Sequence, residues 1–234
     1  MQSPAPTAPT PTALWRQDLA VCGLSLLALL AWDLAGADLA VARLWGSPTG
    51  FAWRDHWLTR DLLHEGGRLA GWAVFALLLL NIWRPLPFAR SVPRPVRIWW
   101  ALAPLACVAL IPLLKRASPV SCPWDLAEFG GAARYLSHWA WGQADGGGGG
   151  CFPSGHASTG FAFLSGWFAL RLHAPRAARV WLAATLLAAT AFGWAQLARG
   201  AHYPSHTLWT GWICLSLLTA LSALRPELRG RRQA

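Results

Sequence analysis

Charged side chains are scarce in this sequence. Only 13% of its 234 residues are Asp, Glu, Lys or Arg, whereas soluble domains average about 25%. Several apolar runs approach the roughly 20 residues that cross a bilayer as a helix. The shortage of charge therefore argues against a soluble protein with buried helices, and the apolar runs predict an all-α, polytopic membrane protein.

Lysine is almost absent. The 20 basic residues include a single lysine, Lys115, and they outnumber the 10 acidic residues to give a net charge of +10. In a membrane protein such an excess reports topology and contact with anionic lipid headgroups. We therefore expect the bilayer and a membrane lipid as partners, and no nucleic acid. The 17 tryptophans are expected at the membrane interfaces.

Two common sequence signals are also missing. Residues 1–13 show neither hydrophobic periodicity nor a cleavable signal pattern, so we expect a disordered tail there. The glycine run at residues 146–150 is not followed by Gly-Lys-Ser/Thr. This argues against a nucleotide-binding loop and favours a flexible hinge.

Six apolar segments are long enough to be membrane-spanning helices. The first two belong to an N-terminal region, residues 14–97, in which residues 53–65 are expected to lie flat on the membrane as an amphipathic helix. The last four form a core at residues 98–224, which a basic tail, residues 225–234, follows. The predicted spans are residues 18–36, 68–83, 98–114, 156–172, 179–197 and 205–224.

Basic residues gather in alternate connections, namely residues 84–97, residues 171–179 and the C-terminal tail. Six spans place both termini and these connections on one side, which the positive-inside rule makes cytoplasmic. The polar stretches 115–156 and 199–206 then face outward. We therefore predict a protein of the bacterial inner membrane whose chemistry faces the periplasm or the exterior.

Chemically useful residues gather at the outer ends of the last four spans. Pro153 and Ser154 favour the start of a helix, whose unpaired N–H groups and dipole attract phosphate. His156 stands in the first turn of that helix, where it can pass a proton. The three clusters are Lys115 and Arg116 with Cys122-Pro123-Trp124-Asp125, then Pro153-Ser154-Gly155-His156, then Arg199-Gly200-Ala201-His202-Tyr203-Pro204-Ser205-His206.

In order and spacing, these clusters resemble the motifs of the type-2 phosphatidic acid phosphatase superfamily, membrane lipid phosphatases related in their core to vanadium haloperoxidases. Those motifs read Lys-x6-Arg-Pro, Pro-Ser-Gly-His and Ser-Arg-x5-His-x3-Asp, and the resemblance covers roughly residues 98–224. It implies a helical-bundle phosphatase core that hydrolyses a lipid phosphate or diphosphate through a phosphohistidine, with no metal or organic cofactor. A lipid-to-lipid phosphotransferase of the same fold and a non-catalytic lipid-binding or flippase-like protein remain open.

The resemblance also implies a role for each matching residue. His202 takes the place of the nucleophile, and His156 takes that of the acid that protonates the leaving oxygen. Lys115, Ser154 and Gly155 take phosphate-binding places.

Three charged positions of the family pattern are altered, and Ala195 stands where the third motif has serine. Cys122 and Gln196 stand where the motifs have arginine, and His206 stands where they have the aspartate that holds the nucleophile's ring. A histidine can orient that ring, but it does not stabilise a cation as a carboxylate does. As replacements we expect Arg199 for one guanidinium, Arg116 or Arg134 for the other, and Asp125 or Glu128 for the negative charge.

Cys122 and Cys151 both lie in the loop region between apolar runs. A disulfide between them is plausible if that region faces an oxidising compartment, and two free thiols are the alternative. His202 and His206 have the spacing of two metal ligands on a helix, but Pro204 lies between them and no third ligand is evident. We therefore expect no metal.

Overall fold

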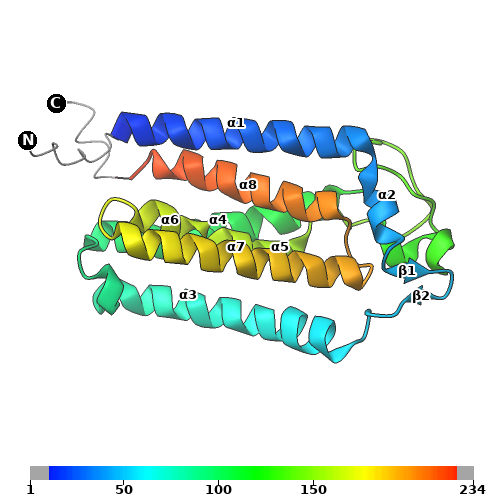
Figure 1. Cartoon of the computed structure of the whole chain (residues 1–234), viewed down its shortest axis with the longest axis horizontal. Helices are drawn as coiled ribbons and strands as arrows, with labels where there is room; N and C mark the ends of the chain where they lie inside the picture. Colours follow the sequence, from blue (N-terminus) through cyan, green and yellow to red (C-terminus); the bar gives the residue numbers. More distant parts are fainter. Residues whose placement is uncertain (1–10, 226–234) are drawn as a thin grey trace, which may run out of the picture.

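The protein is a bundle of long helices that run side by side (Figure 1). The computed structural model describes residues 11–225. The predicted helical class is confirmed. The helices of the bundle are α1 (Pro11–Ala35), α3 (Gly67–Trp83), α4 (Arg94–Ala117), α5 (Gly155–Phe161), α6 (Ser165–Leu170), α7 (Pro175–Ala198) and α8 (Pro204–Ser222).

Helix α1 begins earlier than the sequence indicated. Its first residue is Pro11, so residues 11–13, which we assigned to a disordered tail, are helical. Proline suits the first turn of a helix because no hydrogen bond is required of its nitrogen there. The rest of that predicted tail, residues 1–10, and residues 226–234 of the predicted basic tail lie outside the described residues.

Between residues 11 and 225, four helices are long and apolar enough to cross a membrane. The fourth predicted span, residues 156–172, is instead divided into α5, a 3₁₀ turn at Ala162–Leu164 and α6. The sixth becomes α8, whose 19 residues include buried Ser, Thr and His side chains. The count of six spans therefore stays a prediction. The four helices are Thr12–Ala35, Leu58–Trp83, Arg94–Ala117 and Pro175–Ala198.

The segment predicted as an amphipathic helix at residues 53–65 is helical only from Leu58, and it is not a separate helix. Residues Leu58–Gly66 form a π-helical segment that continues directly into α3, which makes one helix of 26 residues. Gly67 does not interrupt it, because its backbone stays helical at φ −60° and ψ −40°. A Cβ at Gly67 would lie 2.6 Å from the ring of Phe192 in α7. The missing side chain therefore lets α3 and α7 approach closely.

Small residues also set the spacing at the centre of the bundle. A Cβ at Gly160 of α5 would lie 2.6 Å from the Cα of Ala189 in α7, so these helices pack backbone to backbone. Two apolar clusters surround this contact. One fills the space among α3, α4, α6 and α7, and the other lies among α4, the Ala162–Leu164 turn, α6 and α8. Helix α5 is thereby fixed in the interior, while α1 covers α8 from outside (Figure 1).

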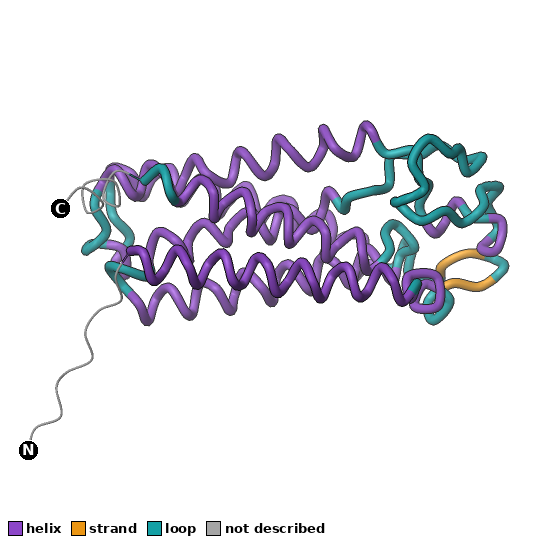
Figure 2. Tube along the Cα trace, turned by 90° about the horizontal axis from the view of Figure 1, so that it is seen from above, coloured by secondary structure: helices purple, strands orange, loops and turns teal. Residues whose placement is uncertain are grey.

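One end of the bundle carries a cap of loops and short elements (Figure 2). The cap joins α2 (Ala37–Ala42) and an antiparallel hairpin of β1 (Gly46–Ser47) and β2 (Gly50–Phe51) to the long connection between α4 and α5. That connection contains two 3₁₀ turns, Pro123–Asp125 and Ala127–Phe129. The core of the cap is formed by Ala42, Phe51, Leu126, Phe129, Ala133 and Tyr203.

Candidate active site

The start of α5 lies at the cap end of the bundle and is tied to α8. Ser154 precedes the helix in an extended conformation, and its N–H donates to the carbonyl of His206 over 3.2 Å. The hydroxyl of Thr210 donates to the Ser154 carbonyl over 2.9 Å. The Ser154 side chain is buried, yet its hydroxyl has no hydrogen-bond partner among residues 11–225. Because an unpaired buried hydroxyl is costly, this group is suited to bind a ligand.

Lys115 reaches the same helix start from α4. It lies in the last turn of that helix and is half-buried. A Cβ at Gly155 would lie 3.9 Å from the Cδ atom of Lys115, so the lysine side chain passes close to the first residue of α5. The structure therefore brings the lone lysine and the Ser-Gly-His sequence together.

His202 follows a tight turn at the end of α7. The Gln196 carbonyl accepts the N–H groups of Ala201 over 2.8 Å and of His202 over 3.2 Å. Gly200 permits this turn, because its φ of 73° lies in the left-handed region and a Cβ there would lie 2.4 Å from the Phe51 ring. His202 is consequently buried and held by its backbone.

The two ring nitrogens of His202 differ. Nδ1 lies 3.4 Å from Nδ1 of His206 and 3.5 Å from the sulfur of Cys151, whereas Nε2 makes no hydrogen bond within the described part of the chain. Burial, together with the positive charge of Lys115, holds the pKa of His202 well below its ordinary value. The ring is therefore neutral near pH 7 and keeps the lone pair that a nucleophile needs.

The segment that leads into α3 fixes the ring of His156. Nε2 of His156 donates to the carbonyl of Leu63 over 2.9 Å, which leaves the lone pair of the neutral ring on Nδ1. The ring centre lies 4.5 Å from that of His64 and 5.1 Å from that of Phe192. His64 was not predicted as a site residue, because nothing in its mixed sequence neighbourhood distinguishes it from an interfacial histidine.

The three candidate arginines occupy different places. Arg199 follows α7, donates Nε–H to the carbonyl of Arg54 over 2.9 Å, and lies within electrostatic reach of His156. Arg116 is exposed near the end of α4. Arg134 is also exposed and donates to a loop carbonyl over 3.2 Å. The structure thus brings Arg199 to the site and leaves the expected replacements Arg116 and Arg134 in solvent.

The two carboxylates that we expected to act beside His206 are engaged elsewhere. Asp125 accepts the N–H of Cys122 over 3.2 Å and so caps a 3₁₀ turn. Glu128 is exposed and pairs with Arg43 over 2.5 Å. Neither makes a hydrogen bond to a site histidine in the part of the chain that the structure describes, because each carboxylate is held by a partner within the cap. The electrostatic role expected of one of them stays a prediction.

Two carboxylates from the N-terminal region lie at the start of α8 instead. Asp38 of α2 is buried and accepts the N–H of Ser205 over 3.0 Å together with the Ser205 hydroxyl. Asp33 of α1 accepts the indole N–H groups of Trp139 and Trp209, each over 2.9 Å. Negative charge is favourable at a helix start. These contacts were not predictable, because 106 to 176 residues separate the partners in sequence.

His138 lies between Asp33 and His206. Its Nε2 is 3.3 Å from the Asp33 carboxylate. Its ring stacks on Phe152 with centres 4.4 Å apart, and it meets the His206 ring edge-on at 6.0 Å. Burial lowers the pKa of His138, and Asp33 opposes that effect. The start of α8 is thus surrounded by buried acidic and aromatic groups.

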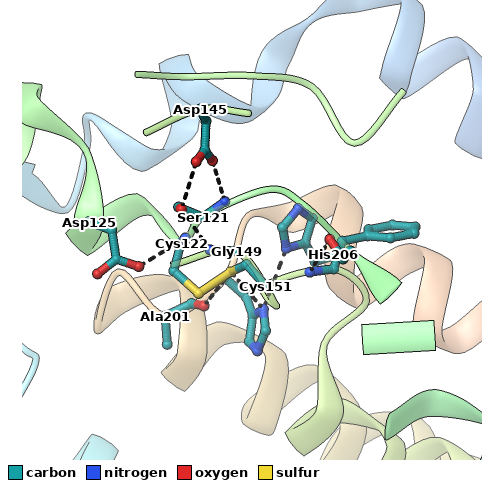
Figure 3. The surroundings of a disulfide bond; sticks show 11 residues. Ser121, Cys122, Asp125, Asp145, Gly149, Cys151, Ala201 and His206 are labelled. Carbon is teal, nitrogen blue, oxygen red and sulfur yellow. Dashed lines mark hydrogen bonds between the residues drawn. A yellow bond between two sulfur atoms is a disulfide. The ribbon is translucent and has the colours of Figure 1, made fainter. Parts of the chain in front are cut away.

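Cys122 and Cys151 form a disulfide, which confirms one of the two alternatives for this pair. Figure 3 shows the bond beside Ala201 and His206, and the Cys151 sulfur lies 3.2 Å from the Ala201 carbonyl oxygen. The disulfide therefore joins the first part of the connection between α4 and α5 to the segment that leads into α5, beside the turn that carries His202.

The glycine run at residues 146–150 is not the flexible hinge that we expected. The Asp145 carboxylate accepts the N–H of Ser121 over 2.5 Å (Figure 3) and the N–H of Gly147 over 2.9 Å. The N–H of Gly149 donates to the Ser121 hydroxyl over 3.1 Å, and that of Gly150 donates to the Ser118 carbonyl over 2.8 Å. Three glycines of the run are thus held by hydrogen bonds, and positive φ angles at Gly146, Gly149 and Gly150 bend the chain toward Cys151.

An apolar groove opens beside the start of α5. It has a volume of about 370 Å³ and lies between α3, α4 and α5. Arg68, Gly155 and Ser158 contribute its polar part. The rest is lined by Gly71, Trp72, Phe75, Pro104, Leu105, Val108, Pro112, Thr159, Ala162 and Phe163.

Comparison with protein families agrees with this geometry. A family model described as the PAP2 superfamily matches residues 97–229, more than half of the chain. Neither the curated proteins nor the solved structures gave a match. The matched region contains Lys115, the sequence at residues 153–156 and His202, and it leaves out α1, α2, the hairpin and α3. The chain therefore belongs to the PAP2 superfamily.

Proposed function

We propose that the protein is an integral membrane phosphatase that hydrolyses a lipid phosphate or diphosphate through a phosphohistidine at His202. Membership of the PAP2 superfamily supports phosphoesterase chemistry, and the long apolar helices support a membrane location. The observation that carries the proposal is the convergence of Lys115, Ser154 and His202 at the cap end of the bundle, beside an apolar groove.

The first chemical step transfers the phosphoryl group to the protein. The lone pair on Nε2 of His202 attacks phosphorus, so a phosphorus–nitrogen bond forms while the bond from phosphorus to the lipid oxygen breaks. His156 has to be protonated on Nδ1 for this step, a form that the negative charge of the bound phosphate favours, and it gives that proton to the departing oxygen. Nδ1 of His202 keeps its contact with His206, which fixes the plane of the attacking ring.

The second step returns the phosphoryl group to water. His156, now neutral, accepts a proton from water on Nδ1, because its Nε2 donates to the carbonyl of Leu63. The water oxygen bonds to phosphorus and the bond to His202 breaks. Inorganic phosphate leaves, and both rings return to their starting state.

Cations and unpaired donors surround the phosphate in this proposal. Lys115 and Arg199 supply positive charge, and the Ser154 hydroxyl supplies a buried donor. Gln196, which replaces a family arginine, is also buried, and its Nε2 has no partner within residues 11–225. We assign it the role of a neutral donor to the phosphate, since its backbone already binds His202.

The cation that forms at His202 also needs negative charge nearby. We assign this role to Asp38 and Asp33, which lie buried at the start of α8, in place of Asp125 and Glu128. Their distance from the reacting atoms makes the effect electrostatic, acting through a poorly solvated interior where charges are weakly screened.

The groove supports a lipid as substrate. Its polar part adjoins the start of α5, and its apolar part follows the helices, as a phosphate headgroup joined to a hydrocarbon chain requires. The connections with Arg84, Arg90 and Arg94 lie at the end of the bundle opposite the cap (Figure 1). The positive-inside rule therefore supports an active face outside the cytoplasm. A cytoplasm-active reporter fused to the C-terminus would be inactive if this orientation is reversed.

Phosphate release from a panel of lipid phosphates and diphosphates tests the proposal. We expect release by the wild type, with an acid-labile, base-stable phosphoryl group trapped on the protein. His202→Ala should lose both, with turnover reduced by about 10²–10⁴-fold or more. His56→Ala, which alters an exposed histidine of the cap, is the matched control and should keep both.

Two other outcomes identify the rival functions. Transfer of the trapped phosphoryl group to an added lipid, with little free phosphate, would indicate a phosphotransferase. Wild-type protein that binds a lipid phosphate yet releases none would contradict the proposal and favour a lipid-binding or flippase-like protein.

A further inference from the structure

Four potential metal ligands lie close together at the site, and one of them is His202 itself. The sulfur atoms of Cys122 and Cys151 and a ring nitrogen of His202 all lie within 4.8 Å of one another, and the three residues are buried. His206 adds a fourth group, because its Nδ1 lies 3.4 Å from Nδ1 of His202. The sequence offered no third ligand for the two histidines, because 51 residues separate Cys151 from His202.

The spacing of these atoms resembles a zinc site. Zinc–nitrogen bonds of about 2.05 Å and zinc–sulfur bonds of about 2.3 Å in a tetrahedron separate two nitrogens by about 3.4 Å and a nitrogen and a sulfur by about 3.6 Å. The corresponding separations here are 3.4 Å between the two histidine nitrogens and 3.5 Å from His202 Nδ1 to the Cys151 sulfur. The sulfur pair is too close for zinc, because a covalent bond holds such atoms about 2.0 Å apart.

We propose that reduction of the Cys122–Cys151 disulfide creates a metal site for Zn²⁺ or a similar soft divalent cation, with His202 and His206 as its nitrogen ligands, and that the bound metal switches the phosphatase off. The bond that prevents metal binding is the same bond that shapes the active loop. Redox state would therefore decide whether the four residues serve catalysis or hold a metal.

The chemistry balances with a dithiol as the reductant. The dithiol gives two electrons and two protons, becomes a cyclic disulfide, and leaves Cys122 and Cys151 as thiols. Binding of Zn²⁺ then displaces two protons from these thiols, and two thiolate–zinc bonds form. The sulfur atoms separate from bonded contact toward the roughly 3.8 Å that a tetrahedral zinc requires.

Metal binding at Nδ1 of His202 would stop nucleophilic attack even though Nε2, the attacking nitrogen, stays uncovered. A neutral imidazole has one nitrogen lone pair, and its other nitrogen carries hydrogen. A metal on Nδ1 of His202 uses that lone pair, so the hydrogen stays on Nε2 and phosphorus cannot be attacked there. This inhibition rests on the proposed role of His202, whereas the metal binding itself does not.

The test uses purified full-length protein and Co²⁺ alone as the probe. Oxidised protein should bind no Co²⁺ at this site. After treatment with a dithiol, mass spectrometry of alkylated protein should count two additional thiols, and one equivalent of Co²⁺ should give thiolate-to-cobalt absorption. With Zn²⁺ in place of Co²⁺, phosphate release by reduced protein should fall more than about tenfold and recover when a chelator is added.

Two sets of variants separate this site from the other cysteines. Replacement of Cys22, Cys107 and Cys214 by Ala removes the free thiols and should leave the cobalt signal intact. Cys122→Ser with Cys151→Ser should abolish it. Because loss of the disulfide destabilises that double variant, His202→Ala serves as a second variant, which keeps both cysteines and should weaken Co²⁺ binding by about 10-fold or more.

The outcomes are distinguishable from those of the phosphatase test. A cobalt site in protein that never releases phosphate would support the metal site and contradict the proposed function. Reduced, folded protein that binds no Co²⁺, or binds it equally after both cysteines are replaced, would overturn the metal site. A disulfide that resists the dithiol in folded protein would overturn it as well.

Discussion

The starts of α5 and α8 face the same site but are built differently. At the start of α5 the chain keeps the family pattern, and the Ser154 hydroxyl is left without a partner among the described residues. At the start of α8 the pattern is altered, and the Ser205 hydroxyl is bound by Asp38. One helix start is open to a ligand, whereas the other is closed by a carboxylate from outside the matched region.

This contrast indicates how the core tolerates a histidine at position 206. The position that carries aspartate in the family motif does not have to carry the charge itself if a neighbouring element supplies it. Here α1 and α2, which lie outside residues 97–229, bring Asp33 and Asp38 to the altered helix start. In the proposed function the N-terminal region therefore contributes charge to the site, through its contacts with the start of α8.

The largest expected effect comes from replacing Ser154 and Ser205, one at a time, by alanine. Ser154→Ala removes a donor that binds no protein group, so kcat/KM should fall by about 10²-fold while the thermal midpoint stays unchanged. Ser205→Ala leaves the buried Asp38 short of a donor and should lower the free energy of unfolding by about 1–3 kcal/mol. Phosphate-release kinetics and thermal unfolding in detergent measure both. A loss of stability in Ser154→Ala would show that the two helix starts do not differ.

The next largest effect concerns the negative charge that Asp38 brings to the start of α8. Asp38→Asn keeps an oxygen that can accept the N–H of Ser205 but removes the negative charge. We expect kcat to fall by about tenfold with KM unchanged, because the cation at His202 is less stabilised in the transition state. Asp125→Asn is the matched control and should leave kcat unchanged, since its carboxylate caps a turn in the cap. Equal losses of kcat in both variants would indicate that Asp38 has no special role in stabilising the cation at His202.

Much of the core was predictable because its signals are local. The apolar runs predict the helices, and the order Lys115, Ser154-Gly155-His156, His202 predicts that these residues converge at one end of the bundle. The outcome for residues 53–65 shows the limit of such reasoning. Their polar pattern suggested a separate interfacial helix, but close packing of Gly67 against Phe192 continues the helix into α3 instead.

The rest of the site depends on contacts that are distant in sequence. Asp38 lies 167 residues before Ser205, and the glycine run is pinned by Asp145 and Ser121 instead of moving freely. Local composition describes Asp38 as interfacial and the glycines as flexible. Only the folded chain reveals which polar groups find a partner, so the carboxylates at the start of α8 could not be chosen from the sequence.

Acidification should distinguish the neutral, buried His202 from a charged one. Its pKa is lowered in the folded protein, so below the unfolded value of about 6.5 the unfolded chain binds a proton that the folded chain does not. Stability is then lost as pH falls below about 6.5, by up to about 1.4 kcal/mol per pH unit for this residue. The free energies of unfolding of wild type and His202→Asn, measured between neutral and acidic pH, should diverge by that amount. Parallel curves would mean that His202 is not buried in its neutral form.

The smallest expected effect tests whether the open start of α5 receives a lipid. Leu105 and Val108 line the groove from α4 and are 43% and 45% exposed, so Val108→Trp fills the groove without disturbing the core. KM for a long-chain lipid phosphate should rise by roughly fivefold, about 1 kcal/mol of lost apolar contact. A short soluble phosphate ester should show no change, because it does not reach the apolar part. Leu113→Trp, at another exposed position of α4, is the control, and an equal rise there would indicate a general effect of tryptophan instead of an occupied groove.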